Sequence, residues 1–99
     1  MRPARSWGSE VGLLNVRVVT PERILFEGEA ASLVAPAWDG KVGILPSHAP
    51  FLTLLGEGDV DVDLAGGGSA RYPVSGGVLK VLANEAIVLT ESGRTASPG

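Results

Sequence analysis

The sequence contains no cysteine, and this absence excludes several kinds of site. Without thiols the protein has no disulfides, no thiolate nucleophile and no zinc–thiolate centre, so its core must hold by packing alone. Histidine is nearly absent as well, because His48 is the only one. A single imidazole rules out the multi-histidine metal site of cupin-type sandwiches. We therefore expect no metal and no other cofactor.

Basic residues and long apolar runs are also scarce. The formal net charge is −3, and lysine occurs only at Lys41 and Lys80, neither of which has a basic neighbour. Nucleic-acid binding requires clustered Lys and Arg, so we expect no nucleic-acid partner. No run of eighteen apolar residues is present, which predicts that the chain does not span a membrane by itself. Residues 1–12 carry arginines without a following apolar run and are not predicted to be a secretory signal.

Short segments with alternating apolar and polar residues fill most of the chain, whose 99 residues suit one domain. In the first of them, Leu14, Val16 and Val18 alternate with Asn15 and Arg17. No stretch has helical periodicity over about ten residues free of glycine and proline. The predicted strands span residues 14–19, 24–26, 29–35, 41–45, 51–55, 59–64, 70–74, 78–82 and 86–90. This pattern predicts an all-β fold, a two-sheet β-sandwich of about ten short strands.

The expected sandwich occupies residues 13–91. Before it, residues 1–12 form a polar extension in which Trp7 is the one large apolar side chain. After it, residues 92–99 are mostly small and polar, and they are expected to be a flexible tail. Within each predicted strand of the sandwich, the apolar residues of the alternating pattern should point into the core. The side chains predicted to be mostly buried are Val16, Val18, Val60, Val62, Ile87 and Leu89.

Turn residues separate the predicted strands. Thr20-Pro21-Glu22, residues 37–40 and the run Gly66-Gly67-Gly68 each predict a reversal of the chain. Asn84-Glu85 lies between two apolar runs and predicts a two-residue hairpin turn. Residues 51–57 leave two alternatives open, a strand or a single helical turn.

Asp59, Asp61 and Asp63 resemble the start of a calcium-binding loop. An EF-hand loop would place glycine at its sixth position and glutamate at its twelfth, but Leu64 and Ala70 stand there. On a strand, carboxylates at every second residue share one face and lie about 6.6 Å apart. We therefore interpret these residues as the solvated face of a strand, without a metal.

No residue is predicted to be catalytic. His48 is the only side chain whose unperturbed pKa lies near neutrality. A hydrolase pairing with Ser47 or Ser75 is formally available, but the adjacent Ser47 and His48 would rarely reach the required geometry. Two other interpretations of His48 stay open: a hydrogen bond to a backbone carbonyl that fixes its loop, and a contact with a partner. The glycines at 66–68 and 76–77 neither precede a helix nor carry the Lys-Ser/Thr of a phosphate-binding loop, so we interpret them as turns.

The segment from Asp39 to Pro50 is the most informative in the chain, because it combines two glycines, two prolines and the only histidine. Glycine allows backbone conformations closed to other residues, and proline fixes φ and removes a donor. This composition predicts a shaped, partly buried loop of the kind that makes functional contacts. Trp38, beside this segment, is expected either in the core or at an interface.

Four motifs, in a fixed order, carry a resemblance to a known family. They are Val-Val-Thr-Pro-Glu at 18–22, Asp-Gly-Lys-Val-Gly-Ile-Leu-Pro-Ser-His-Ala-Pro at 39–50, Leu-Leu-Gly-Glu-Gly-Asp-Val at 54–60 and Val-Ser-Gly-Gly-Val-Leu-Lys-Val at 74–81. With these motifs, residues 13–91 resemble the N-terminal domain of the epsilon subunit of rotary F-type ATP synthase. The resemblance implies a ten-stranded β-sandwich.

The resemblance also implies a function. An epsilon subunit is a non-catalytic part of the central stalk of a proton-translocating ATP synthase. It binds the gamma subunit and rests on the ring of c subunits, and so helps to couple proton flow to ATP synthesis. It is peripheral to the cytoplasmic face of the bacterial inner membrane and is held there only through the complex.

Particular contacts follow from the resemblance. The residues that match the edge facing the c ring are Asp39, Gly40, Lys41 and Val42. The residues expected to contact gamma are Thr20 and His48, by position in the motifs, and Trp38, as an aromatic side chain beside the same segment.

Two features differ from the family pattern. Lys41 stands where an acidic or neutral residue is expected, and the sequence lacks the two C-terminal helices that in many relatives restrain ATP hydrolysis and in some bind ATP. One other function class stays open, a free-standing β-sandwich binding module. A carbohydrate-binding module would need several aromatic residues on one face, whereas those of this chain are scattered at Trp7, Phe26, Trp38, Phe51 and Tyr72.

Overall fold

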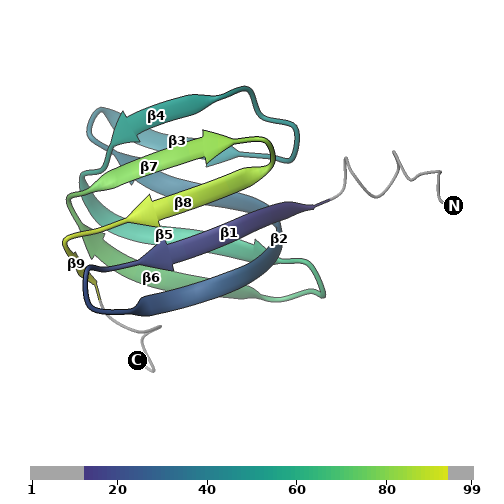
Figure 1. The fold of residues 1–99 in the computed structure, drawn as a ribbon, viewed down its shortest axis with the longest axis horizontal. Coiled ribbons are helices and arrows are strands. Elements are labelled where there is room, and N and C mark those ends of the chain that lie inside the picture. The colour runs from purple at the N-terminus through teal and green to yellow at the C-terminus, as the bar shows by residue number, and fades with distance from the viewer. Residues whose placement is uncertain (1–12, 94–99) are drawn as a thin grey trace, which may run out of the picture.

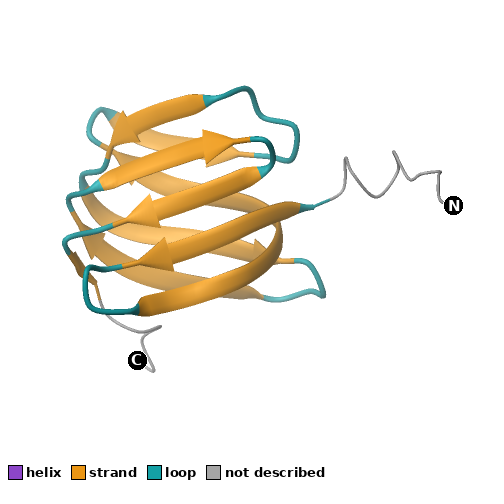
Figure 2. Cartoon of the chain, in the orientation of Figure 1, coloured by secondary structure: helices purple, strands orange, loops and turns teal. Residues whose placement is uncertain are grey.

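Residues 13–93, described by a computed structural model, form nine β-strands in two facing layers (Figure 1, Figure 2). The strands are β1 (Leu14–Val19), β2 (Ile24–Ala37), β3 (Gly40–Ile44), β4 (Phe51–Leu54), β5 (Glu57–Leu64), β6 (Ser69–Ser75), β7 (Val78–Leu82), β8 (Glu85–Leu89) and β9 (Ser92–Gly93). The described part of the chain contains no helix that could cross a membrane. The predicted all-β sandwich is confirmed.

One long strand, β2, belongs to both layers, and this explains its 14 residues. Its first half pairs with β1, and its second half, beyond a register shift after Ala30, pairs with β5 and β3. The front sheet therefore has the order β4-β7-β8-β1-β2, and the back sheet has the order β3-β2-β5-β6-β9. Two strands predicted separately at 24–26 and 29–35 are thus one strand that bends between the sheets. All paired strands are antiparallel except β1 and β8, which run parallel.

The core lies between the two sheets and consists mainly of aliphatic side chains. In β1 the burial alternates as predicted, since Val16 and Val18 are buried while Arg17 is exposed. Val60 and Val62 of β5 face them from the back sheet and are fully buried. The prediction that these four valines form part of the core is confirmed.

The prediction that Ile87 and Leu89 are buried is wrong, because the alternation of buried and outward residues in β8 is shifted by one position. Ala86 and Val88 are the buried residues of β8, and Leu89 is 46% exposed. The parallel pairing with β1 sets this phase, because it places Ala86 and Val88 beside the buried valines of β1. Ile87 and Leu89 therefore point outward from the front sheet.

The turn before β8 lies one residue earlier in the chain than predicted. It consists of Ala83 and Asn84, not of Asn84 and Glu85. Both residues have positive φ, 53° and 63°, which is the signature of a type I′ hairpin turn. The reversal at Gly66–Gly68 is confirmed, since β5 ends at Leu64 and β6 begins at Ser69.

Residues 51–57 contain no helical turn. They comprise β4, an isolated bridge from Leu55 to Ala37, and the start of β5. Ser92 and Gly93, which we expected in the C-terminal tail, form β9 and pair with β6. The remaining tail and the predicted polar extension at 1–12 lie outside the described residues.

Candidate interaction surface

The segment from Trp38 to Pro50 is not one loop in the structure. Trp38 and Asp39 form a two-residue turn between β2 and β3, Gly40–Ile44 form β3, and the residues after Ile44 form a second loop that leads to β4. β3 separates the turn from the second loop, so Trp38 and His48 lie at opposite ends of this strand. The single loop that we predicted is therefore a turn and a separate loop, at opposite ends of β3.

Trp38 is at the surface rather than in the core, with 69% of its area exposed. Its backbone N–H donates to the carbonyl of Leu54 at 3.0 Å, which ties the β2–β3 turn to the end of β4. The backbone is thus fixed while the indole stays exposed. An exposed tryptophan on a fixed backbone loses little conformational entropy when a partner covers it.

His48 fixes the second loop, in agreement with the structural interpretation of this residue. Its Nδ1 lies 2.7 Å from the carbonyl oxygen of Ala49, and its ring meets Phe51 edge-on at 5.5 Å between centroids. A carbonyl oxygen only accepts, so Nδ1 is the donor in this hydrogen bond. The side chain is half-buried, which leaves room for a partner contact as well.

Thr20 also has a local structural role. Its hydroxyl oxygen accepts hydrogen bonds from the backbone N–H groups of Glu22 at 3.3 Å and Arg23 at 3.2 Å. These bonds close the turn between β1 and β2, which confirms the predicted reversal at residues 20–22. A gamma contact at Thr20 stays a prediction.

The four residues predicted to face the c ring lie at the β2–β3 turn and along β3. Asp39 is exposed at the tip of the turn, and Gly40 has a φ of +133° that completes the tight reversal. Lys41 is exposed on β3. Val42 instead pairs with the buried Ala35, and its partly buried side chain packs against the core.

A row of apolar side chains crosses the outer face of the front sheet, and the sequence did not reveal it. Strand register places one residue from each of five strands in this row, in the order Leu54, Val78, Leu89, Val19 and Ile24. We call these residues the apolar row. Leu54, Leu89 and Ile24 are exposed by 61%, 46% and 56%. Several large apolar side chains aligned on one surface indicate a site that another molecule covers.

The apolar row runs between two of the predicted gamma contacts. Thr20 directly follows Val19, and Trp38 is hydrogen-bonded to Leu54 at the other end of the row. His48 belongs to the opposite end of the front sheet, because Phe51, its ring neighbour, begins β4. The structure thus brings Thr20 and Trp38 to one rim of the sheet and places His48 elsewhere.

The three aspartates of β5 do not converge on a metal. Arg71 of β6 lies 2.7 Å from an oxygen of Asp61 and 4.0 Å from one of Asp59, while Ser32 donates to Asp63 at 3.2 Å. The bond to Asp61 and the charge of both carboxylates raise the pKa of the Arg71 guanidinium. In the described part of the chain, no group of three or more His, Cys, Asp and Glu side chains is placed to hold a metal ion.

Residues 13–96 match the family described as "ATP synthase, Delta/Epsilon chain, beta-sandwich domain". The chain belongs to this family. It is 39% identical over 79 residues to the ATP synthase epsilon chain of Moorella thermoacetica, a match that covers 80% of this chain and 59% of that relative. The chain therefore spans about three fifths of that relative's length.

Two solved structures of ATP synthases contain chains with the same fold. One is the Euglena gracilis mitochondrial ATP synthase with its OSCP, F1 and c-ring, with a TM-score of 0.79 and 19% identity over 95% of this chain and 61% of that chain. The other is the central stalk and c-ring of the Tetrahymena thermophila mitochondrial ATP synthase, with a TM-score of 0.69 and 18% identity over 83% of this chain and 66% of that chain. At these identities the likeness concerns the fold.

Proposed function

We propose that the chain is a central-stalk subunit of a proton-translocating ATP synthase, which binds the gamma subunit and the c ring and helps to couple proton flow to ATP synthesis. It has no catalytic role in this proposal, since catalysis belongs to other subunits. It works as a peripheral protein at the cytoplasmic face of a bacterial inner membrane, attached through the complex. Family membership and the fold shared with chains of two ATP synthase assemblies support this assignment.

The apolar row is the single observation that carries the gamma contact. Burial of exposed aliphatic side chains contributes about 25 cal/mol per Å² of apolar area, so a partner that covers this row gains binding free energy. Trp38 at one end adds an aromatic anchor, a residue type enriched among binding hot spots. We assign the gamma contact to the apolar row with Thr20 and Trp38, and we keep His48 as a further contact at the far end of the sheet.

The c-ring contact is assigned to the tip of the β2–β3 turn and to β3. Asp39 and Lys41 present charges of opposite sign there, and Gly40 allows a partner's backbone to approach closely. A contact at such a rim chiefly sets orientation and association rate. The polar loops of a c ring are a suitable partner for a surface of this kind.

Binding to gamma tests the proposal. The gamma subunit encoded in the same genome would be titrated with the wild-type chain, with Trp38→Ala, with His48→Ala and with the double variant L54S/L89S. We expect W38A to weaken binding about tenfold or more, and L54S/L89S to weaken it further, because both remove exposed apolar contacts. Circular dichroism melts of W38A and L54S/L89S should stay close to wild type, since these side chains are exposed.

A matched control is Val34→Ser, which removes an outward apolar side chain from the back sheet and should bind gamma like wild type. If L54S/L89S and W38A both bind gamma as tightly as wild type does, gamma uses another surface. A wild-type chain that does not bind gamma at all would contradict the stalk assignment and leave the free-standing binding module as the better reading.

A further inference from the structure

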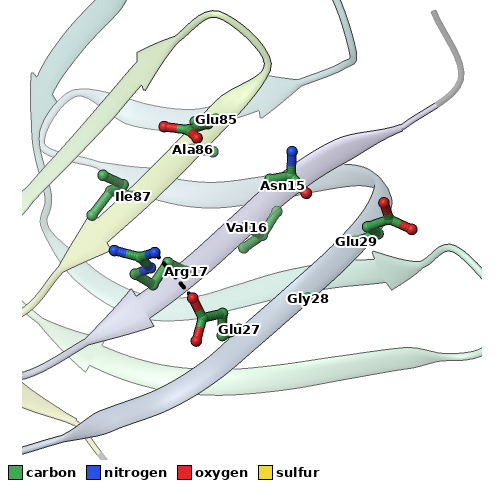
Figure 3. Close-up of a pocket in the computed structure, with 9 residues that line it drawn as sticks. All are labelled: Asn15, Val16, Arg17, Glu27, Gly28, Glu29, Glu85, Ala86 and Ile87. Carbon is green, nitrogen blue, oxygen red and sulfur yellow. Dashed lines mark ion pairs between the residues drawn. The ribbon is translucent and has the colours of Figure 1, made fainter. Parts of the chain in front are cut away.

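A groove of about 370 Å³ crosses the outer face of the front sheet, and Figure 3 shows the residues that line it. It lies beside the apolar row. Its floor is the backbone of three adjacent residues whose side chains are small or turned inward, Ala86, Val16 and Gly28. Because alternate residues of a strand point to opposite faces, the residues before and after these three stand up as two walls. The groove therefore runs across β8, β1 and β2, perpendicular to the strands.

The two walls of the groove differ in charge. One wall consists of Ile87, Arg17 and Glu27, and the Arg17 guanidinium lies 3.0 Å from the Glu27 carboxylate, so the pair is neutral overall. The other wall has Asn15 at its centre, flanked by Glu85 from β8 and Glu29 from β2. Figure 3 shows these two walls and the Arg17–Glu27 ion pair.

Glu29 and Glu85 give the groove an excess of negative charge. Neither carboxylate has an ion pair or a side-chain hydrogen bond with any residue in the range 13–93. Lys80, the lysine of the front sheet, lies on β7 and pairs with the wall residue Ile87, but it is not part of the groove lining. Two carboxylates at one wall, with an amide between them, favour a cationic group that donates several hydrogen bonds.

We propose that this groove receives an arginine or lysine side chain of the protein that covers the front sheet. The inference rests on the proposed function, in which that protein is the gamma subunit. On β1 the apolar row, at Val19, lies two residues beyond the wall at Arg17 and three beyond the groove floor at Val16, so groove floor and row lie about 10 Å apart at about 3.3 Å per residue. The matching segment of the partner carries apolar side chains and, at about that distance, one basic residue.

A protein cation fits this groove better than a metal ion. Glu29 and Glu85 stand on strands separated by β1, so their backbones are about 10 Å apart. A metal ion needs all its oxygen ligands within about 2.6 Å of the ion itself. A guanidinium instead presents five N–H donors spread over a wide plane. The neighbouring apolar row also requires an occupant with apolar side chains. A partner segment that is both basic and apolar satisfies the two surfaces together.

Titration of gamma with Glu29→Gln plus Glu85→Gln tests the inference. This double variant removes two charges and keeps the shape of both side chains, so we expect Kd for gamma to rise about tenfold or more. The association rate of wild type should fall as salt increases, and this salt dependence should be weaker in E29Q/E85Q. The conservative variant E29D/E85D, which keeps both charges, should bind within a few-fold of wild type.

The matched control is Asp59→Asn plus Asp63→Asn, which removes the same charge from the outer face of the back sheet and should leave gamma binding unchanged. If wild type binds gamma and E29Q/E85Q binds equally well, the groove assignment is wrong and the stalk assignment stands. If wild type does not bind gamma, both assignments fail. Sedimentation adds one more outcome: a wild-type dimer that E29Q/E85Q dissociates would give the groove to a second copy and overturn the proposal.

Discussion

Gly77 passes so close to the carbonyl oxygen of Leu89 that a Cβ at position 77 would lie 2.0 Å from that oxygen. Gly77 also has a φ of +113°, a conformation that side-chain-bearing residues rarely adopt. Its own carbonyl accepts a hydrogen bond from the N–H of Leu55 at 2.9 Å. The start of β7 is therefore pressed against the end of β8 and bonded to the end of β4, at the rim where the apolar row lies.

Replacement of Gly77 by Ala should destabilise the fold severely, by about 3 kcal/mol or more, because the clash is with backbone atoms and the φ is unfavourable. Urea unfolding measures the loss. Gly66→Ala is the control, since nothing lies within 4 Å of a Cβ at that position. We expect G66A to change the free energy of unfolding by less than about 1 kcal/mol. Equal stability of G77A and G66A would contradict this packing.

Thr90 holds the turn before β7 from inside the fold. Its side chain is fully buried, and its hydroxyl donates to the carbonyl of Gly76 at 2.9 Å and accepts from the N–H of Ser75 at 3.4 Å. Thr90→Val keeps the shape but leaves those backbone groups without this partner, so we expect a loss of about 1–3 kcal/mol in the free energy of unfolding. The control is Thr53, whose hydroxyl reaches, among the described residues, only the adjacent Leu54 carbonyl at 3.4 Å. Thr53→Val should stay within about 0.5 kcal/mol of wild type.

Tyr72 should make stability depend on pH at the alkaline end. Burial raises the pKa of its phenol, because the charged form is poorly solvated there. The folded state therefore holds this proton more tightly than the unfolded state. Its stabilising contribution is complete below the unfolded pKa of about 10 and is lost as pH rises through the higher folded value.

We expect the free energy of unfolding of wild type to fall more steeply above pH 10 than that of Tyr72→Phe. Tyr72 is the only tyrosine, so phenolate absorbance reports this group alone. The absorbance should titrate at higher pH in the folded protein than in urea. Superimposed titration curves, or parallel stability curves for wild type and Y72F, would contradict the prediction.

The sequence allowed the fold to be predicted because period-two alternation is strong in β1 and β5. Val16 and Val60 each stand between polar residues, so their phase is unambiguous. In β8 both sets of alternate residues are apolar, and the larger pair, Ile87 and Leu89, was assigned to the core. Only the register with β1 decides between the two sets, and register is a long-range property.

The same ambiguity hid the interaction surface. Leu89 contributes to the apolar row because it points outward, and Glu85 contributes to the groove because the hairpin turn is Ala83-Asn84. The sequence signal was an apolar residue, such as Val19, at a position where the alternation predicts an outward-facing polar side chain. It gains meaning only when five strands are aligned, since no two residues of the row are neighbours in the sequence.

Lys41 gives the last prediction, because β3 is an edge strand. β3 pairs only with β2 among the described strands, so its other side presents unpaired backbone groups. A lysine on such an edge prevents pairing with another chain, because its charge would have to be desolvated.

Lys41→Val removes this protection from a strand that then reads Gly-Val-Val-Gly-Ile. We expect K41V to self-associate, seen as a weight-average mass that rises with concentration in light scattering, whereas wild type stays monomeric. Lys41→Glu replaces one charge by another and should stay monomeric as well. Self-association of K41E to the same degree as K41V would show that the charge at this edge is not what keeps it unpaired.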